Sequence, residues 1–340
     1  MSFSRSRFQS YVDFTGTQIG SIAYLGLAQF NGDAYFGDVQ FSGDANFQYT
    51  RFNGTTNFAE VRFGRKADFN NGHFSGNTFF TQSQFIGNAY FFGSQFISKD
   101  VDWVFPRGIA NFDLTQFNNY TDFSGAQFSG DADFKGANFA KDLKLNYAGF
   151  YNLNLLNVSF KPSALVSLSD GEFMRSDSSR ILVRWDSIKN HLVYNELAYL
   201  YLIRNFKSLG FFDDADDCYY EYRWNKMFSQ TSFFGSLGDI ISWASCGYGI
   251  GWINTVASAI FMIFLFGIIF SKHFCWDLRN AMWASAIVML SLPAEWFPFG
   301  KDQYENFIKY HRKLAAFERL MGWSLLIILI STLSRIMIRY

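Results

Sequence analysis

The chain has 340 residues with 29 basic and 29 acidic side chains, so its formal net charge is zero. This length allows two or three domains, and the balanced charge excludes recognition of a partner by bulk electrostatics alone. The three cysteines and four histidines are scattered, and no spacing typical of a catalytic or phosphate-binding motif occurs. The sequence therefore predicts no disulfide framework, no metal site, no cofactor and no enzymatic activity.

Residues 8–150 contain an internal repeat built on phenylalanine. Alternating steps of five and six residues separate the Phe side chains, so two interleaved series each recur every eleven residues. Nearly every unit also carries Gly, Asn or Asp, which opposes a helical coil and favours a β-solenoid with these residues at its turns. The first series comprises Phe30, Phe41, Phe52, Phe63, Phe74, Phe85 and Phe96, and the second comprises Phe36, Phe47, Phe58, Phe69, Phe80 and Phe91.

This region resembles the pentapeptide-repeat family, whose units follow a small-x-Phe/Leu-polar-polar pattern. Ala132-Asp133-Phe134-Lys135-Gly136 and Ala137-Asn138-Phe139-Ala140-Lys141 match the pattern directly. The resemblance implies a right-handed quadrilateral β-helix over residues 1–161, with about four units per coil. Because every second unit has one inserted residue, we expect about 22 residues per coil and about six coils.

The predicted rod has a break between Ile97 and Ile109, which we interpret as a loop bulging from one coil or, alternatively, as a binding loop. Some pentapeptide-repeat proteins are acidic mimics of duplex DNA, but residues 1–160 hold 13 acidic and 11 basic side chains. That excess is too small for such a role, so we expect no nucleic-acid mimicry. The interpretation is a stiff spacer or an interaction rod with a protein partner. The N-terminus lacks an apolar run of signal-peptide length, which predicts a cytoplasmic rod.

Residues 162–230 are predicted to form a linker. Within it, residues 176–228 change from the solenoid repeat to steps of three and four residues, which are typical of amphipathic helices. We predict one helix that begins near Ser178 or Ser179 and ends before Gly210. A second helix should begin near Asp213, where several carboxylates suit a helix N-terminus. Together they form a helical hairpin that links the rod to the last third of the chain. The first helix is predicted from Ile181, Trp185, Ile188, Leu192, Leu197, Leu200 and Ile203.

Residues 231–340 carry long apolar segments that predict a membrane domain. We expect an interfacial helix over 233–249, a first span over 252–271 and a second span over 312–339. Between the spans lie fifteen uncharged residues, 280–294, which are too few to cross a hydrocarbon core about 30 Å thick. They are expected to enter the membrane and return, as a short helix and loop within 278–300.

This order of span, short helix, loop and span resembles the two-transmembrane, potassium-channel-like ion-channel family. The resemblance is carried by Trp283 and Ser285 and by the run from Arg312 to Trp323, with Gly322 where that family often has a glycine. Potassium channels have Thr-x-Gly-Tyr-Gly at the filter, whereas this chain has no glycine there. The predicted filter is Ser291, Leu292, Pro293, Ala294, Glu295 and Trp296, and the inner-helix candidates are Glu318, Gly322, Leu326, Ile330 and Ser334.

Two functions follow from the resemblance and the residues. The first is an oligomeric cation channel, not classically potassium-selective, in which copies of Glu295 form an acidic ring; the alternative for Glu295 is an exposed loop position or a pair with Lys301. Glu318 is expected to hydrogen-bond the short helix, or to serve as a pore-side carboxylate. The second function is a membrane-anchored scaffold with a non-conducting pore domain.

The expected assembly is a homo-oligomer in the inner cell membrane. By analogy with the ion-channel family we expect a tetramer, and a pentamer is the alternative. Both termini are placed in the cytoplasm on the strength of the rod, although basic residues between the uncharged centres of the two spans oppose this orientation. They are Lys272, Arg279, Lys301, Lys309, Arg312 and Lys313.

Overall fold

The computed structural model describes residues 1–97, 109–169, 179–229, 247–249 and 252–337. The chain divides into two compact units, Met1–Tyr219 and Tyr220–Tyr340. We describe each unit by itself. Most of the expected interfacial helix over 233–249 and most of the break between Ile97 and Ile109 lie outside the described residues.

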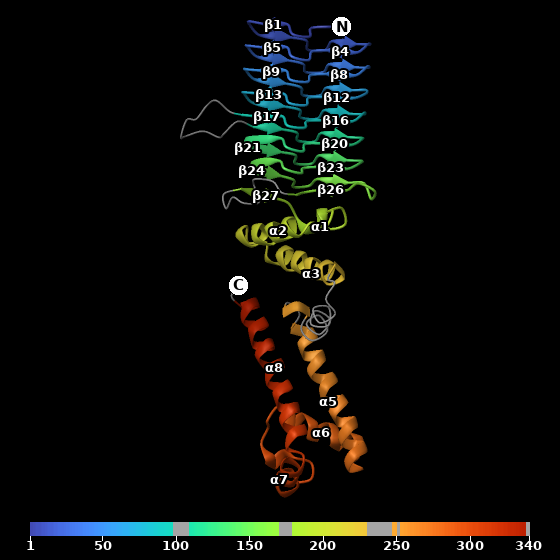
Figure 1. The fold of residues 1–340 in the computed structure, drawn as a ribbon, viewed down its shortest axis with the longest axis vertical. Helices are drawn as coiled ribbons and strands as arrows, with labels where there is room; N and C mark the ends of the chain where they lie inside the picture. The colour runs from blue at the N-terminus through green and yellow to red at the C-terminus, as the bar shows by residue number, and fades with distance from the viewer. Residues whose placement is uncertain (98–108, 170–178, 230–246, 250–251, 338–340) are drawn as a thin grey trace, which may run out of the picture. The chain divides into compact units, whose positions relative to one another are not determined.

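The first unit is a parallel β-solenoid of about seven turns (Figure 1), one more than expected. Strands in successive coils pair with a spacing of 22 residues, as in Phe8↔Phe30 and Phe41↔Phe63. The expected coil length is therefore confirmed. The pair Gln84↔Gln116 is separated by 32 residues instead, which places ten extra residues in the coil that contains the break.

The solenoid has four faces. The first two join into one sheet through the longer strands β21 and β24, and the other two are separate sheets. The first face contains β1 (Arg7–Phe8), β5 (Gln29–Phe30), β9 (Arg51–Phe52), β13 (His73–Phe74) and β17 (Gln95–Phe96). The second contains β2 (Val12–Asp13), β6 (Ala34–Tyr35), β10 (Thr56–Asn57), β14 (Thr78–Phe79) and β18 (Ala110–Asn111). The joining strands are β21 (Gln127–Asp133) and β24 (Gly149–Asn154), and β27 (Arg180–Leu182) pairs with β24.

The third and fourth faces are separate sheets of seven strands. The third face contains β3 (Gln18–Ile19), β7 (Gln40–Phe41), β11 (Arg62–Phe63), β15 (Gln84–Phe85), β19 (Gln116–Phe117), β22 (Asn138–Phe139) and β25 (Ser159–Phe160). The fourth contains β4 (Ala23–Tyr24), β8 (Ala45–Asn46), β12 (Ala67–Asp68), β16 (Ala89–Tyr90), β20 (Thr121–Asp122), β23 (Leu143–Lys144) and β26 (Val166–Ser167).

Stacked phenylalanines fill the interior of the solenoid. Phe36 and Phe58 stack with ring centroids 4.7 Å apart, and Phe47 and Phe69 stack at 4.8 Å. The rings of adjacent faces meet edge to face, an arrangement that favours aromatic pairs beyond their burial. The small residue two positions earlier, such as Ala34 or Ala45, also points inward and is fully buried. The repeat thus encodes the core directly.

Glycines at the corners allow successive coils to approach closely. A Cβ on Gly43 would lie 2.6 Å from the backbone carbon of Ser21, and one on Gly32 would lie 2.7 Å from that of Ser10. Real Cβ atoms do not approach backbone atoms so closely, so these corners require glycine.

The solenoid continues past its expected end at residue 161, through β26 and β27. The single helix expected from Ser178 or Ser179 to Lys207 is wrong: Ser178 lies outside the described residues, and Ile181 is in strand β27. The helices that follow are α1 (Trp185–Ile188), α2 (Glu196–Ser208) and α3 (Phe212–Ser229). Gly210, with φ +77°, lies between α2 and α3 near the expected turn.

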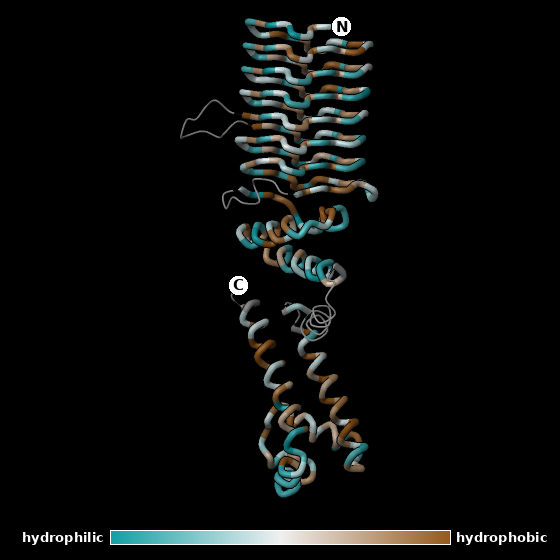
Figure 2. Tube along the Cα trace, in the orientation of Figure 1, coloured by the Kyte–Doolittle hydropathy of each residue, from teal (hydrophilic) through white to brown (hydrophobic). Residues whose placement is uncertain are grey.

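The second unit contains two long apolar helices, α5 (Trp252–Phe274) and α8 (Arg312–Met337). Both are long and apolar enough to cross a membrane, and hydrophobic residues run along them in Figure 2. They are antiparallel, with Phe266 of α5 facing Phe317 of α8. Between them come α6 (Leu278–Met289), η3 (Ala294–Trp296) and α7 (Lys301–Tyr310), and the short turn η2 (Gly247–Gly249) precedes α5.

Candidate functional site

The short helix α6 packs against both long helices. Asp277 caps its start by accepting a hydrogen bond from the Arg279 amide. A Cβ on Gly267 of α5 would lie 2.6 Å from Cγ of Met282, so α5 and α6 touch at this point. The apolar cluster around α6 includes residues from α5, α7 and α8: Phe266, Phe270, Ala281, Ala284, Ile287, Val288, Phe297, Phe307 and Ala315.

The C-terminal end of α6 lies beside the middle of α8. A Cβ on Gly322 would be only 2.2 Å from the carbonyl oxygen of Met289, so only glycine fits there. Gly322 is ten residues beyond Arg312, at which α8 begins, and ten helical residues rise about 15 Å. The end of α6 is therefore about 15 Å along α8 from its start, which is half the thickness of a hydrocarbon core.

One buried hydrogen bond joins α6 to α8. The Ser285 hydroxyl donates to Oε1 of Glu318 at 2.5 Å, and both side chains are almost fully buried. This contact matches the hydrogen bond that the sequence predicted for Glu318. The other carboxyl oxygen, Oε2, is buried without a hydrogen-bond partner among the described residues. Glu318 is therefore enclosed between α6 and α8.

The turn after α6 reverses the chain. Ser291 adopts a left-handed conformation with φ +52°, and the Leu292 amide donates to the Ile287 carbonyl at 2.9 Å. The Trp323 indole of α8 donates to the Ser291 hydroxyl at 3.2 Å, which fixes the turn at mid-helix. The Trp283 indole of α6 donates to the Trp296 carbonyl at 2.9 Å. The chain thus runs along α6 to Ser291, reverses, and comes back beside Trp283 at Trp296.

The predicted filter residues lie at or near the surface of the second unit. Ser291, Pro293, Glu295 and Trp296 are exposed, and Leu292 and Ala294 are half-buried. Within the described part of the chain Glu295 forms no ion pair, so the expected alternative of a pair with Lys301 is absent here. The segment therefore presents one carboxylate, that of Glu295, on the surface of the second unit.

Of the inner-helix candidates, Leu326, Ile330 and Ser334 are exposed, whereas Glu318 and Gly322 are buried against α6. Sequence reasoning missed the helix α7, whose Tyr304 accepts a hydrogen bond from Arg319. The spacing of Tyr304, Phe307 and Ile308 was a signal for it, because apolar residues at three- and four-residue steps indicate one helical face. In the described residues, no group of three His, Cys, Asp or Glu side chains is placed to hold a metal.

Comparison with protein families identifies pentapeptide repeats (9 copies), matched over residues 14–62, 26–72 and 107–149. The matched residues that the structure describes lie in the β-solenoid, so the chain contains a pentapeptide-repeat domain. No curated protein and no solved structure matches the chain.

Proposed function

We propose that this chain, a pentapeptide-repeat β-solenoid followed by two apolar helices, is the subunit of an oligomeric, cation-conducting membrane channel. The observation that carries the proposal is the path of residues 278–296, which runs to the middle of α8 and back. A helix of 12 residues is about 18 Å long and is too short to cross a membrane. If α5 and α8 span the bilayer, the turn at Ser291 lies at mid-depth.

Non-helical backbone is tolerated at that depth only where protein buries it or water reaches it. Most residues of the turn from Ser291 to Trp296 are exposed on one subunit. An arrangement of several copies around a shared aqueous axis lets water reach this turn. Copies of Glu295 then form an acidic ring near the end at which α6 begins, which concentrates cations and repels anions. We expect selectivity for cations over anions without strict preference for potassium, because no glycines allow a ladder of backbone carbonyls.

The antiparallel arrangement of α5 and α8 places the start of α5 and the end of α8 on the same side of the membrane. We assign that side to the cytoplasm of the cell, together with the solenoid. The solenoid then serves as an interaction or assembly module, the role that pentapeptide repeats suggest. The expected membrane is the inner cell membrane.

The test is current through purified full-length protein in planar bilayers, for wild type and Glu295→Gln. Wild type should conduct cations, and Glu295→Gln should lower the conductance at low salt by about two- to tenfold, with less effect at high salt because screening shortens the reach of the ring. Glu305→Gln is the matched control, since Glu305 is an exposed carboxylate on α7. An equal effect of both substitutions would refute a specific ring at Glu295.

The second candidate function is a membrane-anchored scaffold whose helices conduct nothing. The specific observation in its favour is the filter segment, where Pro293 and large side chains replace the glycines that a carbonyl-lined filter requires. Absence of current from correctly folded, oligomeric protein would support this function and reject the channel.

A further inference from the structure

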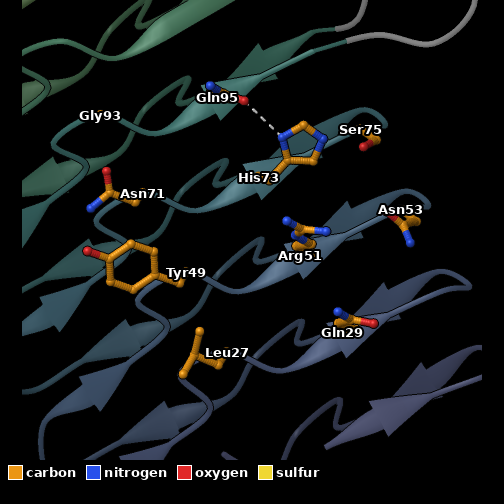
Figure 3. A pocket seen from close by; sticks show the side chains of 10 residues that line it. All are labelled: Leu27, Gln29, Tyr49, Arg51, Asn53, Asn71, His73, Ser75, Gly93 and Gln95. Carbon is orange, nitrogen blue, oxygen red and sulfur yellow. Dashed lines mark hydrogen bonds between the residues drawn. The ribbon is translucent and has the colours of Figure 1, made fainter. Parts of the chain in front are cut away.

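A groove crosses four coils on the first face of the solenoid and encloses about 650 Å³. Its floor is the row of outward side chains Gln29, Arg51, His73 and Gln95, one from each coil (Figure 3). One wall is the row of turn residues Leu27, Tyr49, Asn71 and Gly93, and the other wall is formed by Asn53 and Ser75. Its volume is in the range of ligand-binding pockets.

The groove contains a guanidinium group that the protein itself does not use. Among the described residues, Arg51 forms no hydrogen bond and no ion pair, although it is exposed on the floor. Its neighbours on the same row are engaged: Gln29 accepts from Nε of Arg7 at 3.0 Å, and the His73 Nδ1 contacts Gln95 Oε1 at 3.0 Å. None of the ten lining residues is acidic. An uncompensated positive charge therefore stands in a concave polar site.

The third face shows that this charge pattern is local. Arg62 occupies the equivalent strand position there, but its guanidinium donates to Oε1 of Gln84 at 2.9 Å. The turn residues beside that face include the carboxylates Asp38 and Glu60, where the first face has Leu27 and Tyr49. The repeat thus places two arginines in matched positions. Arg62 is hydrogen-bonded and is close in sequence to the acidic residue Glu60, whereas Arg51 has no such partner in the described part of the chain and lies beside Leu27 and Tyr49.

We propose that the groove on the first face binds an extended acidic segment of a partner protein, with a carboxylate of that segment on Arg51. The guanidinium offers paired N–H donors that match a carboxylate. The amides of Gln29, Asn53 and Asn71 supply both donors and acceptors for peptide groups, while Leu27 and Tyr49 supply an apolar contact.

The length of the groove fits such a segment. Three coil spacings of about 4.8 Å separate Gln29 from Gln95, which is about 14 Å, or four to five extended residues. A nucleic acid is the poorer occupant, because its affinity depends on several cations placed along the phosphate backbone and the groove has one permanent charge. The inference does not depend on whether the membrane unit conducts ions.

The experiment measures fluorescence anisotropy of full-length protein in detergent with an array of end-capped hexapeptides that carry two glutamates, against the same array with glutamine in place of each glutamate. At least one glutamate peptide should bind wild type tenfold or more tightly than its glutamine partner. Arg51→Gln should abolish that tenfold preference. Arg62→Gln removes the same formal charge from the matched position on the third face and should preserve the preference.

Circular dichroism should show equal solenoid content for both variants, because Arg51 and Arg62 are exposed. Equal binding of glutamate and glutamine peptides, or equal loss in Arg51→Gln and Arg62→Gln, would overturn the proposal. So would a lack of binding by every peptide in the array, or displacement of a bound peptide by a duplex DNA oligomer at lower concentration than by the unlabelled peptide. Self-association through this face, seen as a larger particle that Arg51→Gln dissociates, would overturn it as well.

Discussion

At the residue scale, the carboxylate of Asp68 shows how the solenoid holds a buried charge. Asp68 is only 2% exposed, and its oxygens accept hydrogen bonds from Nε2 of Gln48 at 2.7 Å and from the Asn70 amide at 3.2 Å. Lys66 completes the site at 2.9 Å. The hydrogen bond from Lys66 to Asp68 raises the pKa of the lysine above its ordinary value of 10.5.

Asp68→Asn should destabilise the solenoid by about 1–3 kcal/mol at neutral pH, because a buried, charge-assisted set of hydrogen bonds is weakened. The part of this loss that comes from Lys66 depends on pH. A lysine whose pKa is raised by folding contributes stability below its unfolded value, and that stability is lost as pH rises through the folded value. The difference in unfolding free energy between wild type and Asp68→Asn should therefore narrow above about pH 10.5.

Denaturant unfolding followed by circular dichroism, at neutral pH and through about pH 11, measures this difference. The pH-dependent part should be small, below about 1 kcal/mol, because Lys66 is about half exposed. Lys66→Gln is the control and should remove the pH-dependent part alone. A difference that stays constant with pH would contradict the role given to Lys66.

The same scale shows what the sequence predicted well. The two eleven-residue series predicted that Phe30 to Phe96 and Phe36 to Phe91 lie in the interior, and the structure confirms this. The prediction succeeds because the same residue type has the same role in every coil. The groove at Arg51 was not predicted. Its floor forms only when the coils bring residues 22 apart in the sequence next to one another. Whether Arg51 has a hydrogen-bond partner depends on the side-chain conformations of its neighbours, which the sequence does not show.

At the element scale, the error at residues 176–208 has a physical cause. Ile181, Trp185 and Ile188 follow helical steps, yet Ile181 lies in strand β27. Asn205 of α2 donates to the Ile181 carbonyl at 2.8 Å and accepts from the Ile181 amide at 3.0 Å. Helix α2 thereby satisfies a backbone edge that would otherwise be open at the end of the solenoid. Tertiary pairing decided the strand, and short-range periodicity carries no information about it.

The link between α6 and α8 gives a second prediction at this scale. Ser285→Ala removes the only hydrogen bond that the described residues give to the Glu318 carboxyl group, so it should destabilise the second unit by about 1–3 kcal/mol. In a Glu318→Met background the same change should cost less, because the acceptor of the bond is absent.

A double-mutant cycle on full-length protein in detergent, read by the tryptophan fluorescence of the second unit, measures the coupling. Ser324→Ala is the control, because that hydroxyl donates within α8 to the Leu320 carbonyl. Additive effects of Ser285→Ala and Glu318→Met would contradict a direct energetic link between α6 and α8.

At the scale of the whole molecule, the sequence predicted the order of parts: a solenoid, helices, and two long apolar helices that enclose a short one. The short helix was recognisable because fifteen uncharged residues between Arg279 and Glu295 are too few to span a membrane. The close fit of Gly322 on Met289 depends on packing between segments far apart in the chain. The assembly is harder still to predict from the sequence, since a pore needs surfaces from several copies of the chain.

The proposed channel requires a closed ring, because the described part of one chain contributes two long apolar helices, too few to enclose a pore. In mild detergent we expect a particle whose native mass is four times the 39.2 kDa of one chain. In a background with the three native cysteines replaced by serine, Glu295→Cys should form disulfide-linked dimers readily, because a shared axis brings copies of residue 295 together. Ile260→Cys is the control: Ile260 is 60% exposed on α5, where a ring leaves it toward lipid. A monomeric mass, or faster cross-linking at residue 260 than at residue 295, would place the turn outside the assembly and remove the basis for a pore.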